Sequence, residues 1–262
     1  MLSQLSSPIQ ALILDMDGVL YRSNEAIGDL PAIFRRIDEL GLKVMYATNN
    51  TFHTPAQYVG RLAGFGVRSE EWQFITAPLA TARALSKRWP EGGPIHMMGE
   101  VGLRKVMEDK GFYHADENVL AVVSGLDKSF TYDMFVKAIR LIVKGAPFIG
   151  TNPDLTFPTP DGPAIGTGGQ LAILETCSGV KPEIIGKPYP AMMEMALERL
   201  GMQPQEALVV GDRLNTDIAA GQAAGCKTAL VLTGIATREE AETWHPRPDI
   251  IAEDLAAILL LD

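Results

Sequence analysis

Short apolar runs alternate with segments of helical period along the chain. The run at 11–14 (ALIL) is continuously hydrophobic, which is typical of a strand buried on both faces of a sheet. The same reasoning predicts strands at 43–47, 74–75, 183–185, 207–210, 228–232 and 249–251, and helices at 29–40, 54–62, 191–200, 217–224 and up to about 260. Because strand–helix–strand order places helices on both faces of a mostly parallel sheet, the predicted fold is α/β and doubly wound.

The middle of the chain alternates in the same way, but no polar signal follows its strands. The pattern predicts strands at 95–98, 120–124 and 148–149 and helices at 101–110 and 132–144, bounded by Pro- and Gly-rich stretches at 90–94 and 158–169. We therefore expect residues 79–182 to form an inserted α/β domain. The first domain is then discontinuous and consists of residues 1–78 and 183–262.

Composition excludes several classes of protein. The formal net charge is −9 and the pI is about 5.0, which argues against a duplex nucleic-acid binder, because such a protein needs a basic face. The late apolar run 255–261 is far shorter than the roughly 20 residues that span a membrane. The N-terminus lacks the basic segment of a signal peptide, and two cysteines are too few for a disulfide framework. We expect a soluble, cytoplasmic protein that binds neither nucleic acid nor membrane.

Polar residues follow four of the predicted strands. Ligands of parallel sheets bind beyond the carboxyl ends of the strands, so these residues are the candidate site. Each stretch alone has an ordinary structural interpretation, such as a turn or a helix cap, and only their joint placement indicates a function. The stretches are Asp15-Met16-Asp17-Gly18-Val19, Thr48-Asn49-Asn50, Gly186-Lys187-Pro188 and Gly211-Asp212-Arg213, with Thr216-Asp217 shortly after.

This set of side chains fits phosphoryl transfer. Three carboxylates with one obligate cation form a natural site for Mg²⁺, and the ion together with Lys187 would offset the charge of a phosphate. A carboxylate nucleophile needs that screening before it can approach a phosphate dianion. Thr48 and nearby N–H groups could hold the phosphoryl oxygens, and Asp17 could act as general acid and then as general base.

The four stretches resemble the motifs of the haloacid dehalogenase (HAD) superfamily, specifically the type IIA branch of NagD-like and p-nitrophenyl phosphatases. The stretch 211–218, with Arg213 and Thr216-Asp217, is especially typical of this branch. The resemblance covers essentially the whole chain, because the branch places a large α/β cap (type C2) between its second and third motifs. It implies a HAD-like Rossmannoid core, an inserted cap and a Mg²⁺-dependent phosphatase acting on a small phosphorylated metabolite.

The resemblance also implies roles for individual residues. Asp15 is the expected nucleophile and Asp17 the general acid and base. Mg²⁺ is expected on the side chains of Asp15 and Asp212 and on the main-chain carbonyl of Asp17, with Asp217 steadying metal-bound water or Lys187. The phosphoryl-binding residues are then Thr48, Asn49, Asn50 and Lys187. The cap loop 150–157, followed by Gly166–Gly169, is expected to contact the leaving group through Asn152 and Asp154.

Alternatives stay open at this point. The same Asp15 and Asp17 chemistry allows phosphoryl transfer to a sugar hydroxyl instead of water. A signalling receiver domain also combines Asp, Thr, Lys and Mg²⁺, but its phosphorylated Asp follows a later strand and its chain is shorter. A non-catalytic binder of phosphorylated ligands would have no need of a nucleophile. Related proteins often pair through their caps, so a homodimer is possible.

Overall fold

The computed structural model describes residues 2, 5, 7–159 and 161–260. The chain divides into two compact units. The first comprises residues 1–48, 55–75 and 187–262, and the second comprises residues 49–54 and 76–186. The sequence-based division instead assigns residues 49–54, 76–78 and 183–186 to the first domain. Among the described residues, none of the helices is both long enough and apolar enough to cross a membrane.

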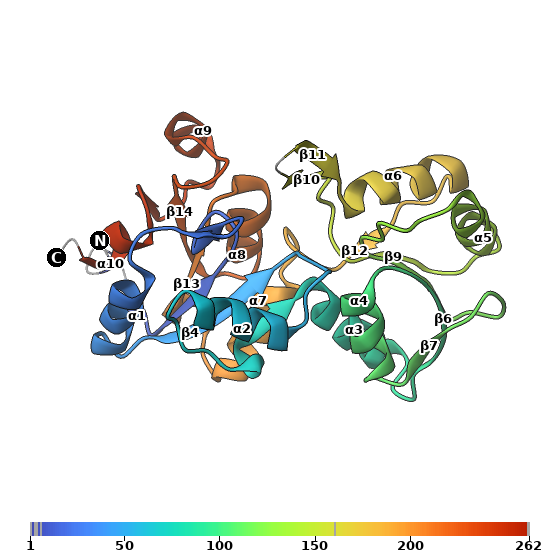
Figure 1. The fold of residues 1–262 in the computed structure, drawn as a ribbon, viewed down its shortest axis with the longest axis horizontal. Coiled ribbons are helices and arrows are strands. Elements are labelled where there is room, and N and C mark those ends of the chain that lie inside the picture. The colour runs from blue at the N-terminus through green and yellow to red at the C-terminus, as the bar shows by residue number, and fades with distance from the viewer. Residues whose placement is uncertain (1, 3–4, 6, 160, 261–262) are drawn as a thin grey trace. The chain divides into compact units, whose positions relative to one another are not determined.

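The first unit is built on a six-stranded sheet with the order β15-β14-β13-β1-β4-β5 (Figure 1). Neighbouring strands from β15 to β4 run parallel, with Leu14 of β1 opposite Val210 of β13 and Tyr46 of β4. A small antiparallel hairpin, β2–β3, follows β1. The strands are β1 (Ala11–Leu14), β2 (Tyr21–Arg22), β3 (Glu25–Ala26), β4 (Lys43–Thr48), β5 (Phe74–Thr76), β13 (Ala207–Gly211), β14 (Lys227–Val231) and β15 (Ile250–Ala252).

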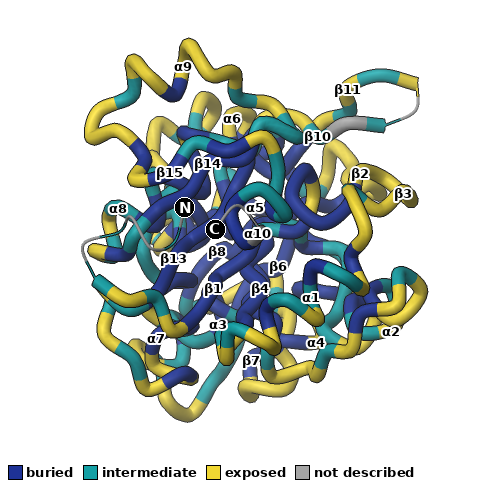
Figure 2. Tube along the Cα trace, turned by 90° about the vertical axis from the view of Figure 1, so that its left-hand side faces the viewer, coloured by how far each residue is buried: buried dark blue, intermediate teal, exposed yellow. Residues whose placement is uncertain are grey.

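Helices cover both faces of this sheet. One face packs against α1, α2 and α10, whose apolar residues join Leu12, Leu14 and Tyr46 in one core cluster. The other face lies against α7 and α8, where Gly221 of α8 contacts Val209. Figure 2 shows the strands as buried and the outer turns of the helices as exposed. The helices are α1 (Leu30–Glu39), α2 (Pro55–Gly64), α7 (Ala191–Leu200), α8 (Ala219–Ala223), α9 (Arg238–Thr243) and α10 (Leu255–Leu260), with a π-helical turn at Leu214–Ile218 before α8.

The predicted helix boundaries follow from local chemistry. Asp29 caps α1 by accepting a hydrogen bond from the N–H of Ala32 at 3.0 Å, and Pro31 stands in the first turn. Gly41 follows the C-cap with a φ of +67°, a conformation that favours glycine, so the helix ends there as predicted. These signals are local, and the sequence alone was sufficient to find them.

The second unit has its own parallel five-stranded sheet with the order β12-β9-β8-β6-β7. Helices α5 and α6 pack together over one face, where Val122, Phe135 and Leu171 share an apolar cluster, and α3 packs on α4. The elements are α3 (Ala77–Arg88), β6 (Gly93–Met98), α4 (Val101–Glu108), β7 (Phe112–His114), β8 (Val122–Ser124), α5 (Tyr132–Val143), β9 (Phe148–Gly150), the hairpin β10 (Thr156–Thr159) and β11 (Gly162–Ile165), α6 (Thr167–Ser178) and β12 (Glu183–Ile184).

One predicted strand lies in the other sheet. The apolar run 183–185 was expected to belong to the sheet that contains β1, but β12 pairs with β9, with Glu183 opposite Ile149. The physical reason is pairing: β12 completes the edge of the second sheet, and the backbone continues from it through hydrogen bonds of Ile185 and Gly186 to Gly150 and Thr151. Lys187 is therefore not delivered by a strand of the first sheet.

Candidate active site

A buried lysine joins two carboxylates in the first unit. Asp15 directly follows β1, and its N–H continues the ladder to the carbonyl of Val210 at 2.8 Å. The Nζ of Lys187 donates to Oδ1 of Asp15 and to Oδ1 of Asp217, both at 2.6 Å, and to the carbonyl of Ala47 at 2.9 Å. Lys187 is only 2% exposed. The ammonium donates all of its hydrogens within this group, so its position is fixed by charge-assisted hydrogen bonds.

Asp212, which follows β13, completes the group that we call the core cluster: Asp15, Lys187, Asp212 and Asp217. Its Oδ2 accepts a hydrogen bond from the N–H of Ile235 at 3.0 Å. Its Oδ1 is buried and has no hydrogen-bond partner in the part of the chain that the structure describes. A buried carboxylate oxygen without a partner is costly unless something else binds it. One carboxylate oxygen each of Asp15, Asp212 and Asp217 lie within 4.8 Å of one another.

Asp217 differs from the other two carboxylates because both of its oxygens are already used. Oδ1 accepts from Lys187, and Oδ2 accepts from the N–H of Arg213 at 3.1 Å. The π-helical turn at Leu214–Ile218 brings this side chain back over Gly211, where a Cβ would lie 2.1 Å from the Cβ of Asp217. Asp217 therefore positions Lys187, and within the described part of the chain Asp15 and Asp212 keep oxygens available to a ligand.

The charges of the core cluster do not balance. Burial raises the pKa of Asp15 well above its ordinary value, Lys187 opposes this shift, and Asp217 and Asp212 add to it. Burial and then the charge of Asp217 raise the pKa of Asp212 to about 6. Burial works against the charge of Lys187, yet Asp15 and Asp217 more than offset it and hold its pKa above the ordinary value. Three carboxylates thus face one ammonium in a region of low dielectric.

These features fit a small divalent cation. Oxygen ligands are what hard cations such as Mg²⁺ take, and a bound cation would supply the missing positive charge and a partner for Oδ1 of Asp212. The donor set holds carboxylate oxygens and no sulfur or imidazole, which favours Mg²⁺ or a similar ion over softer metals.

Two further predicted residues belong to the same unit, one close to Asp15 along the chain and one on the neighbouring strand. Asp17 is exposed in the turn that follows Asp15, and its backbone pairs with Tyr21. Thr48 ends β4, next to β1 in the sheet, and is buried. Gly18 has a φ of +82°, and a Cβ there would lie 2.6 Å from Cγ of Asp212, so a side chain at this position would displace that carboxylate.

The remaining predicted residues gather in the second unit. The Nδ2 of Asn152 donates to the carbonyl of Asn49 at 2.8 Å, and the Nδ2 of Asn49 donates to Oδ2 of Asp154 at 3.2 Å. Asn50 makes a local turn in which its Oδ1 accepts from the N–H of Phe52 at 2.8 Å. Asn49, Asn152 and Asp154 thus contact one another. Their contact with a substrate stays a prediction.

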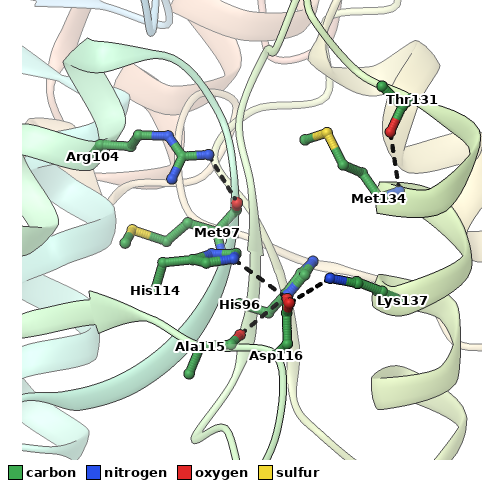
Figure 3. A network of polar contacts seen from close by, with 9 residues as sticks. All are labelled: His96, Met97, Arg104, His114, Ala115, Asp116, Thr131, Met134 and Lys137. Carbon is green, nitrogen blue, oxygen red and sulfur yellow. Dashed lines mark hydrogen bonds and ion pairs between the residues drawn. The ribbon is translucent and has the colours of Figure 1, made fainter.

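Sequence reasoning missed a second cluster, which we call the histidine cluster: His96, His114, Asp116 and Lys137 (Figure 3). His96 and His114 are far apart along the chain, so their spacing gives no sign of the cluster, although His114 and Asp116 stand close together in the sequence. In Figure 3 the rings of His96 on β6 and His114 on β7 both face Asp116, and Lys137 reaches it from α5. Oδ1 of Asp116 lies 3.2 Å from Nδ1 of His96 and 3.4 Å from Nε2 of His114.

Hydrogen bonds decide what this histidine cluster can bind. Nδ1 of His114 accepts from the N–H of Met97 at 3.1 Å, so the proton of the neutral ring is on Nε2, which faces Asp116. Nδ1 of His96 lies 3.2 Å from the carbonyl of Ala115, which requires a proton on that nitrogen. Both nitrogens that face Asp116 are therefore donors, and a metal would have to displace both protons as well as the ammonium of Lys137. The histidine cluster does not fit a metal.

Comparisons with known proteins assign the chain to a family. Residues 12–113 match the model of the haloacid dehalogenase-like hydrolases, and residues 184–258 match a HAD-hydrolase-like model. A 5'-nucleotidase, YutF, of Bacillus subtilis is 37% identical over 236 residues, which are 90% of this chain and 92% of that protein. An acid sugar phosphatase of Staphylococcus aureus is 34% identical over 94% of this chain and 95% of its own.

Solved structures agree with this assignment. A p-nitrophenyl phosphatase from Archaeoglobus fulgidus is similar with a TM-score of 0.89 and 32% identity, over 96% of this chain and 98% of that chain. NagD from E. coli K-12 is similar with a TM-score of 0.88 and 34% identity, over 95% of this chain and 97% of its own. The chain belongs to the haloacid dehalogenase-like hydrolases and, within them, to the type IIA branch of NagD-like and p-nitrophenyl phosphatases.

Proposed function

We propose that this protein is a Mg²⁺-dependent phosphatase that hydrolyses small phosphomonoesters through an aspartyl-phosphate formed on Asp15. The observation that carries the proposal is the core cluster, in which buried carboxylates outnumber the single ammonium and Oδ1 of Asp212 has no partner among the described residues. The similar proteins are named as a nucleotidase and phosphatases, which supports hydrolysis over transfer of the phosphoryl group to an alcohol.

The side chains of Asp15 and Asp212 and the main-chain carbonyl of Asp17 would hold the metal. When bound, the ion polarises the phosphoryl oxygens and screens the repulsion between the phosphate and the attacking carboxylate. Asp217 holds Lys187 through Oδ1 at 2.6 Å, and Lys187 in turn orients Asp15. Lys187 thus fixes one oxygen of Asp15, and among the described residues the other oxygen is left to attack or to bind the ion.

The reaction follows from these positions. An oxygen of Asp15 attacks phosphorus, and the bond between phosphorus and the leaving-group oxygen breaks while Asp17 gives that oxygen a proton. Asp17 then removes a proton from water, the water oxygen attacks phosphorus, and the bond to Asp15 breaks. Inorganic phosphate leaves, and Asp15 is again a free carboxylate. Asp17 suits both steps because it is exposed and stands two residues from the nucleophile.

Binding of the substrate is assigned to the remaining predicted residues. Thr48, Asn49 and Asn50 are proposed to bind the phosphoryl oxygens together with Lys187, and Asn152 and Asp154 to contact the leaving group. Support comes from the hydrogen bonds that join Asn49 to Asn152 and Asp154. In the same proposal the first unit is the catalytic core and the second is the cap. A homodimer and a cytoplasmic location stay predictions.

The test is a substitution of the nucleophile. Asp15→Asn should abolish hydrolysis of p-nitrophenyl phosphate, and labelled phosphate trapped by rapid acid quench should appear on the wild-type protein but not on the variant. The control is Asp109→Asn, which changes an exposed aspartate that pairs with Lys105. Near-normal turnover by Asp15→Asn would reject the nucleophile, and activity unchanged by EDTA would reject the metal.

A further inference from the structure

The loop after β14 contacts the core cluster, although none of the sequence motifs includes it. We call residues 232–236 the β14 loop. The Oγ1 of Thr233 donates to the carbonyl of Gly18 at 2.5 Å. The N–H of Ile235 donates to Oδ2 of Asp212 at 3.0 Å, and the N–H of Ala236 donates to the main-chain carbonyl of Asp212 at 3.1 Å. One short segment therefore holds both the turn after β1 and the carboxylate after β13.

We propose that Thr233 and Gly234 are positioning residues for the divalent cation, acting on its ligands and not on the substrate. The inference rests on the proposed function, because it concerns the same Asp17 carbonyl and Asp212 side chain. It goes beyond that function by assigning a role in metal affinity to residues outside the motifs. The contacts that carry it all lie within the first unit.

Thr233 acts through Gly18. The N–H of Gly18 donates to the carbonyl of Tyr21 at 2.8 Å, and in a trans peptide the carbonyl of Asp17 then points in the opposite direction. The hydroxyl of Thr233 fixes the next carbonyl along, that of Gly18. Gly18 is thus held on both sides in its left-handed conformation, with φ at +82°. Loss of the hydroxyl would free the second of these peptide units, so the turn that carries the Asp17 carbonyl would lose one of the two hydrogen bonds that hold Gly18.

Gly234 acts through Asp212. A Cβ on Gly234 would lie 1.8 Å from Oδ2 and 2.3 Å from Cβ of Asp212, so the side chain of Asp212 packs directly on this backbone. The close approach lets the N–H of Ile235 reach Oδ2. Because Oδ2 is held there, Oδ1 is the oxygen left without a partner among the described residues. The loop therefore selects which oxygen of Asp212 is available to the cation.

The main-chain carbonyl of Thr233 is also held by a hydrogen bond. A guanidinium nitrogen of Arg22, in β2, donates to the main-chain carbonyl of Thr233. Arg22 and Gly18 belong to the same segment after β1, so the hydroxyl and the carbonyl of Thr233 both connect the β14 loop to that segment. Thr233 therefore connects the two segments through two separate hydrogen bonds.

The experiment measures Mg²⁺ affinity of the full chain by titration calorimetry without substrate. Thr233→Val keeps the shape and removes the hydroxyl, and it should weaken Mg²⁺ binding by roughly tenfold, the lower end for groups that orient metal ligands. Thr233→Ser should restore most of the affinity. Turnover of p-nitrophenyl phosphate by Thr233→Val should recover at saturating Mg²⁺, because the reacting groups are intact.

Controls separate this role from a merely structural one. Thr243→Val removes a comparable hydroxyl-to-carbonyl bond in α9 and should leave Mg²⁺ affinity unchanged. Gly234→Ala, which must displace Asp212, should lose more affinity than Thr233→Val. If Thr233→Val binds Mg²⁺ as tightly as the wild type, this inference is wrong and the proposed function stands. If the wild type itself binds no Mg²⁺ and hydrolyses nothing, both fail.

Discussion

The two polar clusters of this protein are built from similar groups but differ in what they can hold. The core cluster and the histidine cluster each place carboxylate oxygens and a lysine ammonium close together. In the core cluster the lysine is buried and a carboxylate oxygen has no partner within the described residues, whereas in the histidine cluster every group that faces Asp116 is a donor. Spacing alone makes both resemble metal sites. Net charge and the protons on the ring nitrogens that face Asp116 distinguish them.

The largest difference is expected when the lysine of each cluster is removed. Lys187→Met leaves two buried carboxylates without their cation, which typically costs about 3–5 kcal/mol of unfolding free energy. Lys137→Met breaks an exposed ion pair and should cost about 1 kcal/mol or less. Denaturant unfolding of both variants in EDTA measures the two costs. Equal losses would mean that the two lysines are equally important for stability.

Mg²⁺ should stabilise the protein through Asp212 and not through Asp116. A ligand at a hundred times its Kd adds about 2.7 kcal/mol to the free energy of unfolding, so Mg²⁺ should raise the melting temperature of the wild type. Asp212→Asn should abolish that increase, and Asp116→Asn should retain it. Thermal unfolding with and without Mg²⁺ compares them. An increase that survives Asp212→Asn would place the cation elsewhere.

Without metal, Asp212 should destabilise the fold. Its pKa is raised from 3.8 to about 6, so the folded state binds a proton more tightly than the unfolded state. Stability should therefore fall as pH rises from about 4 to 6 and stay lower above it. Asp212→Asn should gain about 3 kcal/mol at pH 8 in EDTA. Denaturant unfolding at pH 4 and pH 8 tests this, and a loss of stability at pH 8 would contradict the assignment.

The histidine cluster should respond to pH in the opposite direction, and more weakly. Burial lowers the pKa of His96, aided by His114, and burial lowers the pKa of His114, aided by Arg104. The unfolded state therefore binds more protons, and stability should fall as pH drops below 6.5. The Asp212→Asn background removes the opposing contribution of Asp212. Adding His114→Asn, whose Oδ1 can replace Nδ1 as acceptor, should flatten the slope. An unchanged slope would exclude His114.

We expect no metal binding at the histidine cluster. Zn²⁺ or Ni²⁺ added to Asp212→Asn should show no saturable binding at the histidine cluster, because its ring nitrogens that face Asp116 carry protons. Titration calorimetry at pH 7 provides the measurement. Binding of one ion that His114→Asn abolishes would overturn the argument from hydrogen bonds and make the two clusters alike.

Most of the first sheet, and the edge that carries the candidate site, could be predicted from the sequence, because the signals are local. An apolar run such as 207–210 is followed at once by Asp212, and Gly41 ends a helix through its own backbone. The prediction failed for the run 183–185, since two sheets compete for the same apolar strand and only pairing partners decide between them. The helix α3 was not predicted, because its apolar residues do not recur with a clear helical period.

The sequence by itself determined the family of this protein: Asp15, Asp17, Lys187 and Asp212 stand after predicted elements in an order typical of one family of hydrolases. Tertiary structure decided how each group is used. It gave both oxygens of Asp217 to Lys187 and Arg213, left one oxygen of Asp212 free among the described residues, and brought His96 to His114. The physical reason is that a side chain's type is encoded locally, whereas its hydrogen-bond partners come from segments far away along the chain.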